Sequence, residues 1–501
     1  MSEKNTYGQI LKSSSVMGGA AVVTMIVGMV KTKFAAVLIG AAGVGLLASY
    51  TAIQGLIQTL AGLGINSSGV RDVAAAVAKG DQEAIGRAVK TLRRMCWLTG
   101  ILGMLTVAAL SPLIGQITFG SGENNLEIAA LGWIVLFVNV SGGKLALMQG
   151  FRRIGDVARV NIISAVTGAL LSTVFYFWLG MRGIVPALII SAGVQLIVSW
   201  HYAKRISMPE VDMTWQESLK EAGSMVRLGI AMMWTGLLSG LVSYATVLMI
   251  KNQFDLHAVG LYSAAFALSG MFVNFVLQAM GADFYPRLVG VAHDKVVMNR
   301  IVNEQTEIGL LLSVPGILAT LLLAPWIIQS FYAKEFIPAV DLLRWFTVGC
   351  LGQVIAWPLG FVMLALGKGR WFVFTETTGR LFQLLLIFLM LNYVGFVGVA
   401  VALLLLYIFY TTIVYIVAKK LTGFTWSVSV KRTLLISIIL IALISLLFSV
   451  LNSGGRLLVS FVLLPIISVY SLRRLINCIG IEHRIVQAAL RFPGVRAICG
   501  F

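Results

Sequence analysis

The chain has 501 residues, of which 58% are hydrophobic and 12% are charged, and its formal net charge at neutral pH is +18. A soluble domain carries about a quarter charged residues, so this composition excludes an ordinary soluble protein. Apolar stretches of about twenty residues recur along the chain, each long enough to cross the ~30 Å hydrocarbon core as a helix. The sequence therefore predicts an all-α, polytopic membrane protein.

Hydropathy predicts about fourteen spans, of which the first two are separated at the glycine-rich stretch IGAAGVG. They cover residues 10–38, 44–65, 95–119, 126–150, 158–179, 184–203, 224–249, 258–282, 307–331, 340–364, 372–391, 397–418, 434–452 and 456–472. The N-terminal residues MSEKNTYGQILKSSS lack the basic region and cleavage site of a signal peptide, so we expect the first span to be retained.

Lys and Arg are distributed unequally between the two sets of connecting segments. Turns such as 120–127 and 392–395 carry few of them, whereas segments 71–94, 151–159 and 419–432 carry many. Because Lys and Arg collect in cytoplasmic loops, both termini are predicted to be cytoplasmic, which requires an even number of spans, 12 or 14. Topology thus accounts for the positive charge, and we expect no nucleic-acid partner.

The cysteines and histidines do not indicate a metal site. The four cysteines form no CxxC pair and the four histidines do not cluster. Neither a disulfide framework nor a zinc site is predicted, and we expect no metal, cofactor or catalytic residue.

An internal repeat relates the two halves of the chain. AGVGLLASYTAIQGL (42–56) aligns with HAVGLYSAAFALSGM (257–271) at an offset of 215 residues, so that Gly45 corresponds to Gly260. We predict two six-helix lobes, 1–220 and 221–419, related by a pseudo-two-fold axis along the membrane normal. Two additional helices follow at 420–473. The basic tail at 474–501 is either an amphipathic helix on the inner leaflet or a disordered charged segment.

Three motifs carry a family resemblance. KFAAVLIGAAGVG (33–45), GADFYPRL (281–288) and KEFIPAVDLLRW (334–345) stand in matching order and positions. The chain resembles bacterial polysaccharide repeat-unit flippases of the multidrug/oligosaccharidyl-lipid/polysaccharide exporter superfamily. The resemblance implies a two-lobed transporter, not an enzyme, in a bacterial inner membrane. Its substrate would be an undecaprenyl-diphosphate-linked oligosaccharide of the O-antigen type, moved from the cytoplasmic to the periplasmic leaflet.

Cations within or beside the spans are the candidate substrate-binding residues. Ionisable groups at membrane depth are costly and usually face a cavity. The candidates are Lys33, Lys31, Arg380, Lys144, Arg227 and Lys12. Lys31 and Lys33 point about 200° apart on a straight helix, and the family pattern favours Lys33 as the one that faces a cavity. Snorkelling to the headgroups is the alternative for Lys33 and Lys144.

Asp283, Glu376 and Arg287 are further candidates, for gating or ion coupling. Glu376 and Arg380 are one helical turn apart, and we predict that they form an ion pair. Asp283 and Arg287 lie at the inner end of a span, where they form either a gate or a helix-end salt bridge. A proton or a sodium ion is the expected coupling ion.

The expected mechanism is alternating access through a central cationic cavity. Fixed Lys and Arg would offset the diphosphate by charge-assisted hydrogen bonds while the prenyl tail stays in membrane lipid. Association with polysaccharide polymerase machinery is a further expectation. The alternatives are a multidrug/cation antiporter of the same superfamily and a membrane-embedded polysaccharide polymerase or ligase.

Overall fold

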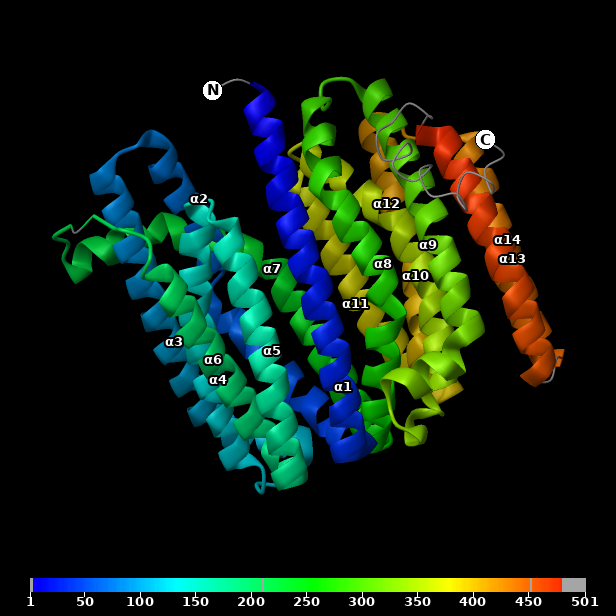
Figure 1. Cartoon of the computed structure of the whole chain (residues 1–501), viewed down its shortest axis with the longest axis horizontal. Helices are drawn as coiled ribbons and strands as arrows, with labels where there is room; N and C mark the ends of the chain where they lie inside the picture. The colour runs from blue at the N-terminus through cyan, green and yellow to red at the C-terminus, as the bar shows by residue number, and fades with distance from the viewer. Residues whose placement is uncertain (1–2, 210, 451–452, 480–501) are drawn as a thin grey trace. The chain divides into compact units, whose positions relative to one another are not determined.

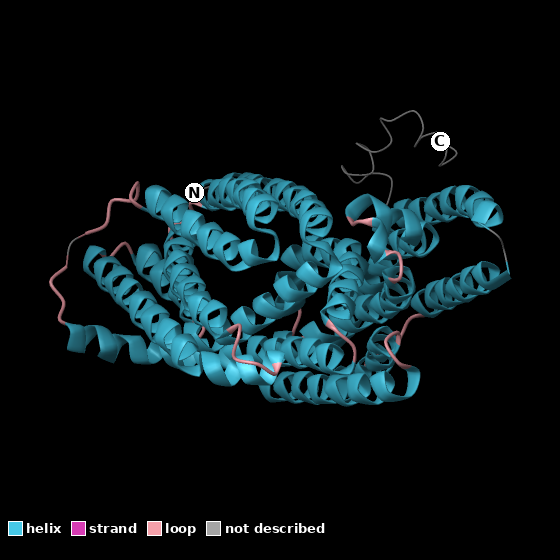
Figure 2. Ribbon diagram, turned by 90° about the horizontal axis from the view of Figure 1, so that it is seen from below, coloured by secondary structure: helices cyan, strands magenta, loops and turns pink. Residues whose placement is uncertain are grey.

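The computed structural model describes the backbone of residues 3–209, 211–450 and 453–479. Over these residues the chain forms helices joined by short connections, with no strand (Figure 2). The α-helices are α1 (Glu3–Gly62), α2 (Ile65–Lys79), α3 (Gln82–Phe119), α4 (Asn125–Gly150), α5 (Ile154–Leu179), α6 (Ile184–Ala203), α7 (Trp215–Gln253), α8 (Leu256–Gly290), α9 (Lys295–Phe331), α10 (Ala339–Ala365), α11 (Gly369–Val394), α12 (Gly398–Thr422), α13 (Val428–Val450) and α14 (Ser453–Ile479). Two short 3₁₀ helices cover Gly180–Gly183 and Lys334–Phe336.

The predicted all-helical membrane fold is confirmed. Each predicted span coincides with a helix, and α1 accounts for the first two. By length and apolar composition, ten stretches of the described residues qualify as membrane spans. Two of them, Val16–Gly62 with 47 residues and Ile154–Ala203 with 50, are more than twice as long as the about 20 residues that one crossing needs. The count of fourteen and the orientation of the termini stay predictions.

The break between the first two spans lies within the predicted glycine-rich stretch. Gly40 has φ 68° and ψ −176°, which interrupts the helical geometry of α1. Glycine adopts a positive φ at little cost because it has no Cβ, whereas most other residues are strained there. The chain can therefore change direction at Gly40, and the lysine-bearing first half of α1 is oriented independently of its second half.

The polar segment 71–94, predicted as a cytoplasmic loop, is helical instead. Its first part belongs to α2, which buries Ile65 and Val73, and its second part opens α3. Gly80 ends α2 with φ 71°, and the Asp81 carboxylate caps α3 by accepting a hydrogen bond from Ala84 N at 3.1 Å. A short amphipathic helix lacks the apolar length that a span search detects, which explains the difference.

The described chain separates into two compact units. One comprises residues 1–260 with 331–333, and the other comprises 261–330 with 334–501. In the first unit α3 packs on α4, α4 on α6, and α5 on both α1 and α6, and α3 to α6 lie side by side in Figure 1. In the second unit α10 packs on α11 and α12. The boundary between the compact units lies at Gly260 rather than at 220; the six-plus-six division by ancestry stays a prediction.

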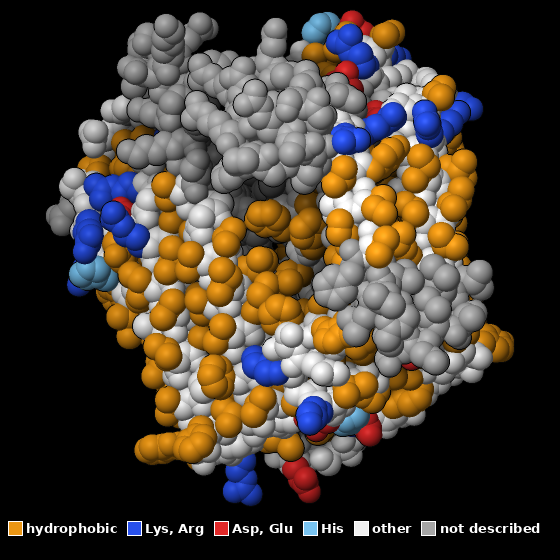
Figure 3. Space-filling model, turned by 45° about the vertical axis from the view of Figure 1, so that its right-hand side comes forward, with side chains coloured by type: hydrophobic (Ala, Val, Ile, Leu, Met, Phe, Trp, Pro, Cys, Tyr) orange, Lys and Arg blue, Asp and Glu red, His pale blue; other side chains and the backbone are white. Residues whose placement is uncertain are grey.

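Each unit has its own buried apolar core, and many side chains on its exposed surface are also apolar. In the first unit the core includes Val73, Leu92 and Met148, and in the second it includes Leu318 and Val354. Large hydrophobic side chains are nevertheless exposed on many helices. In Figure 3 hydrophobic side chains are spread widely over the described surface. Charged side chains in that view lie mostly toward the ends of the helices, as expected where a lipid core surrounds the protein.

The repeat-related residues Gly45 and Gly260 meet each other. A Cβ on Gly45 would lie 1.8 Å from the carbonyl oxygen of Leu256, and a Cβ on Gly260 would lie 2.0 Å from that of Ala41. Ala41 and Leu256 are themselves separated by the repeat offset of 215 residues, so the contact is reciprocal. Such a reciprocal contact is the pattern expected beside a local two-fold axis, which the predicted repeat implies. The close approach of these two segments therefore requires glycine at both positions.

We expect Gly45→Ala to destabilise the protein by about 1–3 kcal/mol, because the new methyl group would overlap backbone that cannot rotate away. Thermal unfolding in detergent measures the effect. Gly55→Ala is the matched control, since nothing lies within 4 Å of a Cβ at Gly55. Equal melting temperatures for the two variants would contradict the proposed contact.

Candidate functional site

A polar cavity of the first unit lies among α1, α4, α5 and α6. It has a volume of about 490 Å³, within the usual range for ligand sites. We call it the N-terminal cavity. Its polar lining consists of Thr24, Lys31, Gln54, Asn161, Ser164, Ser191 and Gln195. Lys31 is the one charged side chain among these described lining residues.

Helical periodicity explains how these side chains reach one space. Thr24, Gly28 and Lys31 succeed one another on a single face of α1. Asn161 and Ser164 do the same on α5, and small residues beside them leave the space open. The hydroxyl oxygen of Ser164 is buried without a hydrogen-bond partner, so it is a polar group that a ligand or water would satisfy.

Lys33, which the family pattern favoured, lies on the other side of α1. Its ammonium group donates a hydrogen bond to the backbone carbonyl of Tyr332, and Lys33 does not line the N-terminal cavity. The structure thus reverses the expected order of the two lysines: Lys31 faces the cavity, and Lys33 contacts backbone. Nothing in the local sequence distinguishes them, because the direction of each side chain depends on which helices pack around α1.

A second cavity lies among α10, α11 and α12 of the second unit. It has a volume of about 310 Å³ and contains both Glu376 and Arg380. The predicted ion pair between them is absent from the described residues. The Tyr410 hydroxyl donates a hydrogen bond to Glu376 Oε1, and Arg380 donates a hydrogen bond of 3.1 Å to Gln383 Oε1. Both charged groups therefore have neutral partners. Glu376 contacts Tyr410 because the neighbouring helix α12 places that hydroxyl within reach of the carboxylate.

Aromatic side chains form one wall of this second cavity. Trp357, Phe361 and Phe372 line it, and the rings of Trp357 and Phe361 are 4.7 Å apart between centroids. The cavity thus combines a carboxylate, a guanidinium group and an aromatic surface. Among the residues that the sequence had not singled out are Tyr407, Tyr410 and Gln383; neutral side chains in apolar spans give no signal by charge or motif.

The other predicted site residues lie elsewhere. Lys144 lines a small cavity with Arg93, and its ammonium group lies 5.5 Å from the ring centroid of Trp200. Arg287 is exposed in the last turn of α8. The side chains of Lys12, Arg227 and Asp283 lie outside the described residues, as does the chain beyond Ile479, so their predicted roles and that of the tail stay predictions.

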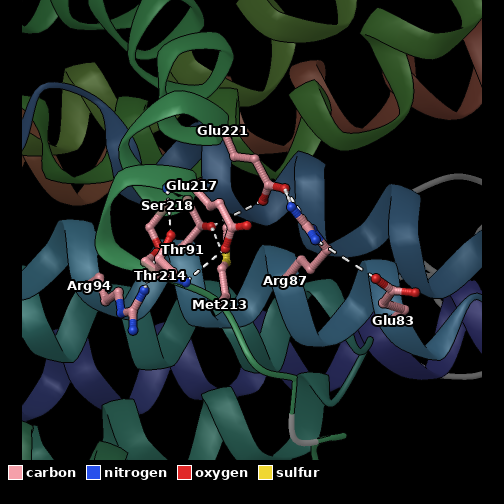
Figure 4. A network of polar contacts seen from close by, with 9 residues as sticks. All are labelled: Glu83, Arg87, Thr91, Arg94, Met213, Thr214, Glu217, Ser218 and Glu221. Atoms are coloured by element: carbon pink, nitrogen blue, oxygen red, sulfur yellow. Dashed lines mark hydrogen bonds and ion pairs between the residues drawn. The ribbon is translucent and has the colours of Figure 1, made fainter.

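A polar network joins the start of α7 to α3 (Figure 4). Arg87 NH2 lies 2.6 Å from Glu221 Oε1, and Arg87 NH1 lies 3.8 Å from Glu83 Oε1. Arg94 donates to the carbonyl oxygen of Thr214 and to the hydroxyl of Ser218, each at 2.7 Å. These bonds explain why α7 packs with the first unit.

The first turn of α7 is closed by a capping box. The Glu217 carboxylate accepts from Thr214 N at 2.8 Å, and Glu217 N donates to the Thr214 hydroxyl at 3.3 Å. Hydrogen bonding to Thr214 holds the pKa of Glu217 below its ordinary value. This contribution to stability is present above the ordinary pKa of a glutamate and is lost as the pH falls through the lowered value. The capping box is therefore intact at neutral pH.

Comparison with solved structures identifies the class of fold. The lipid II flippase MurJ, in an inward closed conformation, matches 91% of this chain and 98% of its own with a TM-score of 0.69 at 15% identity. An inward-facing multidrug resistance transporter of the MATE family and MOP superfamily matches 82% of this chain and 99% of its own, with a TM-score of 0.62 at 14% identity. The fold is therefore that of the MOP superfamily transporters, as the resemblance predicted.

Sequence comparison places the chain in a family. Residues 10–291, more than half of the chain, match the family described as "Polysaccharide biosynthesis protein", and the chain belongs to that family. It is also 24% identical over 418 residues to the lipid III flippase of Escherichia coli (strain K12). This alignment covers 80% of this chain and 96% of that protein. The predicted family resemblance is confirmed.

Tyr410→Phe should lower the free energy of unfolding by about 1–3 kcal/mol, because the half-buried Glu376 would lose its hydrogen-bond donor. Thermal unfolding of the purified protein measures the effect. Tyr393→Phe is the control, since the Tyr393 side chain is 81% exposed. The assigned contact would be refuted by equal stability of the two variants.

Proposed function

We propose that this protein is a flippase for lipid-linked oligosaccharides. We further propose that its substrates are undecaprenyl-diphosphate-linked repeat units of the O-antigen type, and that it moves them from the cytoplasmic to the periplasmic leaflet of a bacterial inner membrane. The family membership and the relative named lipid III flippase support the substrate class. The O-antigen type rests on the resemblance in motif order described above.

The N-terminal cavity is the observation that carries the proposal. A sugar needs hydroxyl and amide groups that donate and accept hydrogen bonds, and Gln54, Asn161 and Gln195 provide such groups. A diphosphate needs a cation, and Lys31 is positioned among those amides. The space of about 490 Å³ accommodates part of a headgroup, while the prenyl tail has no need to leave the lipid.

Transport then requires that the polar headgroup be exposed to each side in turn, which is alternating access. Binding the headgroup in a polar cavity lowers the barrier that hydrocarbon presents to phosphates and sugars. Glu376 is proposed as the coupling group: exchange of its Tyr410 hydrogen bond for a proton or a sodium ion would link ion movement to the second cavity. Arg380, bound only to the neutral Gln383 among the described residues, is a further contact for an anionic headgroup.

The charge of the N-terminal cavity argues against export of cationic drugs through it. Lys31 would repel a cation, and no carboxylate lines the cavity among the described residues. A polymerase or ligase would need a catalytic group facing a reacting sugar, and the cavity lining offers amides, hydroxyls and one amine. Lipid-linked sugar transport is the function that this lining supports best.

Complementation of a strain that lacks its own O-antigen flippase tests the proposal. We expect the wild-type chain to restore O-antigen on lipopolysaccharide for a matching repeat unit. Failure with a range of repeat units, at verified membrane expression, would count against the assignment. Export of a cationic dye instead would favour the antiporter.

Lys31→Ala should reduce restored O-antigen about 10- to 100-fold, because a charge-assisted hydrogen bond contributes ~1.5–3 kcal/mol. Lys33→Ala removes the same group two residues away on the opposite side of α1, and we expect it to retain most transport at equal expression. If Lys33→Ala abolishes transport and Lys31→Ala does not, the assignment of the cavity-facing lysine is wrong.

A further inference from the structure

Three cations gather at one end of the α3, α4 and α6 bundle. Lys144 on α4 and Arg93 on α3 line the same small cavity. Lys204, which follows α6, lies 5.7 Å from the centroid of the Trp200 ring, and Lys144 lies 5.5 Å from the same centroid. Lys144 also experiences the positive charges of both Arg93 and Lys204. We call Arg93, Lys144 and Lys204 the basic cluster.

The basic cluster lacks a counter-ion within the described part of the chain. The side chains of its three members form no ion pair or hydrogen bond there; the contacts of Lys144 and Lys204 with Trp200 are cation–π interactions. Like charges held together near a membrane surface repel each other, and the cost is offset when an anion binds among them. Neighbouring arginines of the first unit behave differently, since Arg87 is paired with Glu221.

Each of the three helices continues from its cation as an exposed apolar stripe. Helical spacing places Trp97 and Ile101 on the face of α3 that bears Arg93, with 36% and 40% of these side chains exposed. On the Lys144 face of α4 the stripe consists of the exposed Trp133 and the half-buried Phe137. On α6 the exposed Ile197 and Trp200 precede Lys204.

In space, the three cations lie at the same end of their helices. On α3 the cation precedes the apolar stripe in sequence, whereas on α4 and α6 it follows the stripe. Because α4 runs antiparallel to α3, the cations nevertheless share one end. The two indole rings near that end, Trp97 and Trp200, are of the kind that lies at headgroup depth. A group of cations at the end of several apolar stripes is complementary to a phospholipid, which has an anionic headgroup and two apolar chains.

We propose that the basic cluster binds the phosphate of an anionic phospholipid whose acyl chains lie along the apolar stripes of α3, α4 and α6. None of its three cations lines the N-terminal cavity, so the lipid site is distinct from the proposed substrate site. Lys144 is thereby assigned to lipid rather than to transported substrate. This site stands whether or not the protein is a flippase.

Native mass spectrometry of the full-length protein in detergent, titrated with phosphatidylglycerol or with phosphatidylcholine of the same acyl chains, tests the site. We expect wild-type protein to retain phosphatidylglycerol preferentially. The variant R93Q/K144Q/K204Q should weaken that binding at least about tenfold, since each cation beside a phosphate contributes to affinity. The control K79Q/K295Q/K431Q removes the same charge from exposed positions on three separate helices, and it should bind phosphatidylglycerol as the wild type does.

Undecaprenyl diphosphate, added as a third ligand, separates lipid from substrate. We expect the triple variant to keep its affinity for this ligand. The proposal is overturned if the variant binds phosphatidylglycerol as well as the wild type does, if the wild type binds phosphatidylcholine equally, or if the variant loses undecaprenyl diphosphate by the same factor. Should the triple variant not fold, Lys204→Gln decides alone: Lys204 is exposed just beyond α6, and its loss should weaken phosphatidylglycerol binding several-fold.

Discussion

The close approach of two backbones at Gly45 and Gly260 is the constraint on which the first unit depends. Each glycine leaves room for a carbonyl oxygen of the opposite segment, so side chains are excluded from the contact. Gly40, five positions earlier, breaks α1 with a positive φ. The second half of α1 is thus held by the glycine contact, while Thr24, Gly28 and Lys31 of the first half line the N-terminal cavity with residues of α5. The orientation of Lys31 depends on that change of direction.

The two cavities treat charge in different ways. In the N-terminal cavity one cation lies among neutral amides and hydroxyls, which suits a ligand with an anionic part and many sugar hydroxyls. In the second cavity a carboxylate and a guanidinium group are one turn apart, yet each is held by a neutral side chain. Because the two do not pair with each other, each is placed to contact an ion or a headgroup. This division of roles is the physical basis of the proposed coupling.

Cations near the bundle ends serve three different purposes. Arg87 and Arg94 join α3 to the start of α7, so that α7 belongs to the first unit together with the six spans predicted before it. The basic cluster has no protein counter-ion among the described residues and lies at one end of exposed apolar helix faces, an arrangement that matches a charged headgroup above acyl chains. Lys31 lies within a cavity. Positive charge in this protein is therefore not explained by topology alone.

The sequence by itself determined the helical class, the family, and the glycines that allow the break and the close contact. These are local properties: apolar length sets a span, and a missing Cβ permits a positive φ or a close backbone. Only the tertiary structure decided that Lys31 faces the cavity, that Glu376 contacts Tyr410 instead of Arg380, and that Lys144 lies beside Trp200. Each of these outcomes depends on which helices, distant in the chain, pack together, and hydropathy carries no information about that choice.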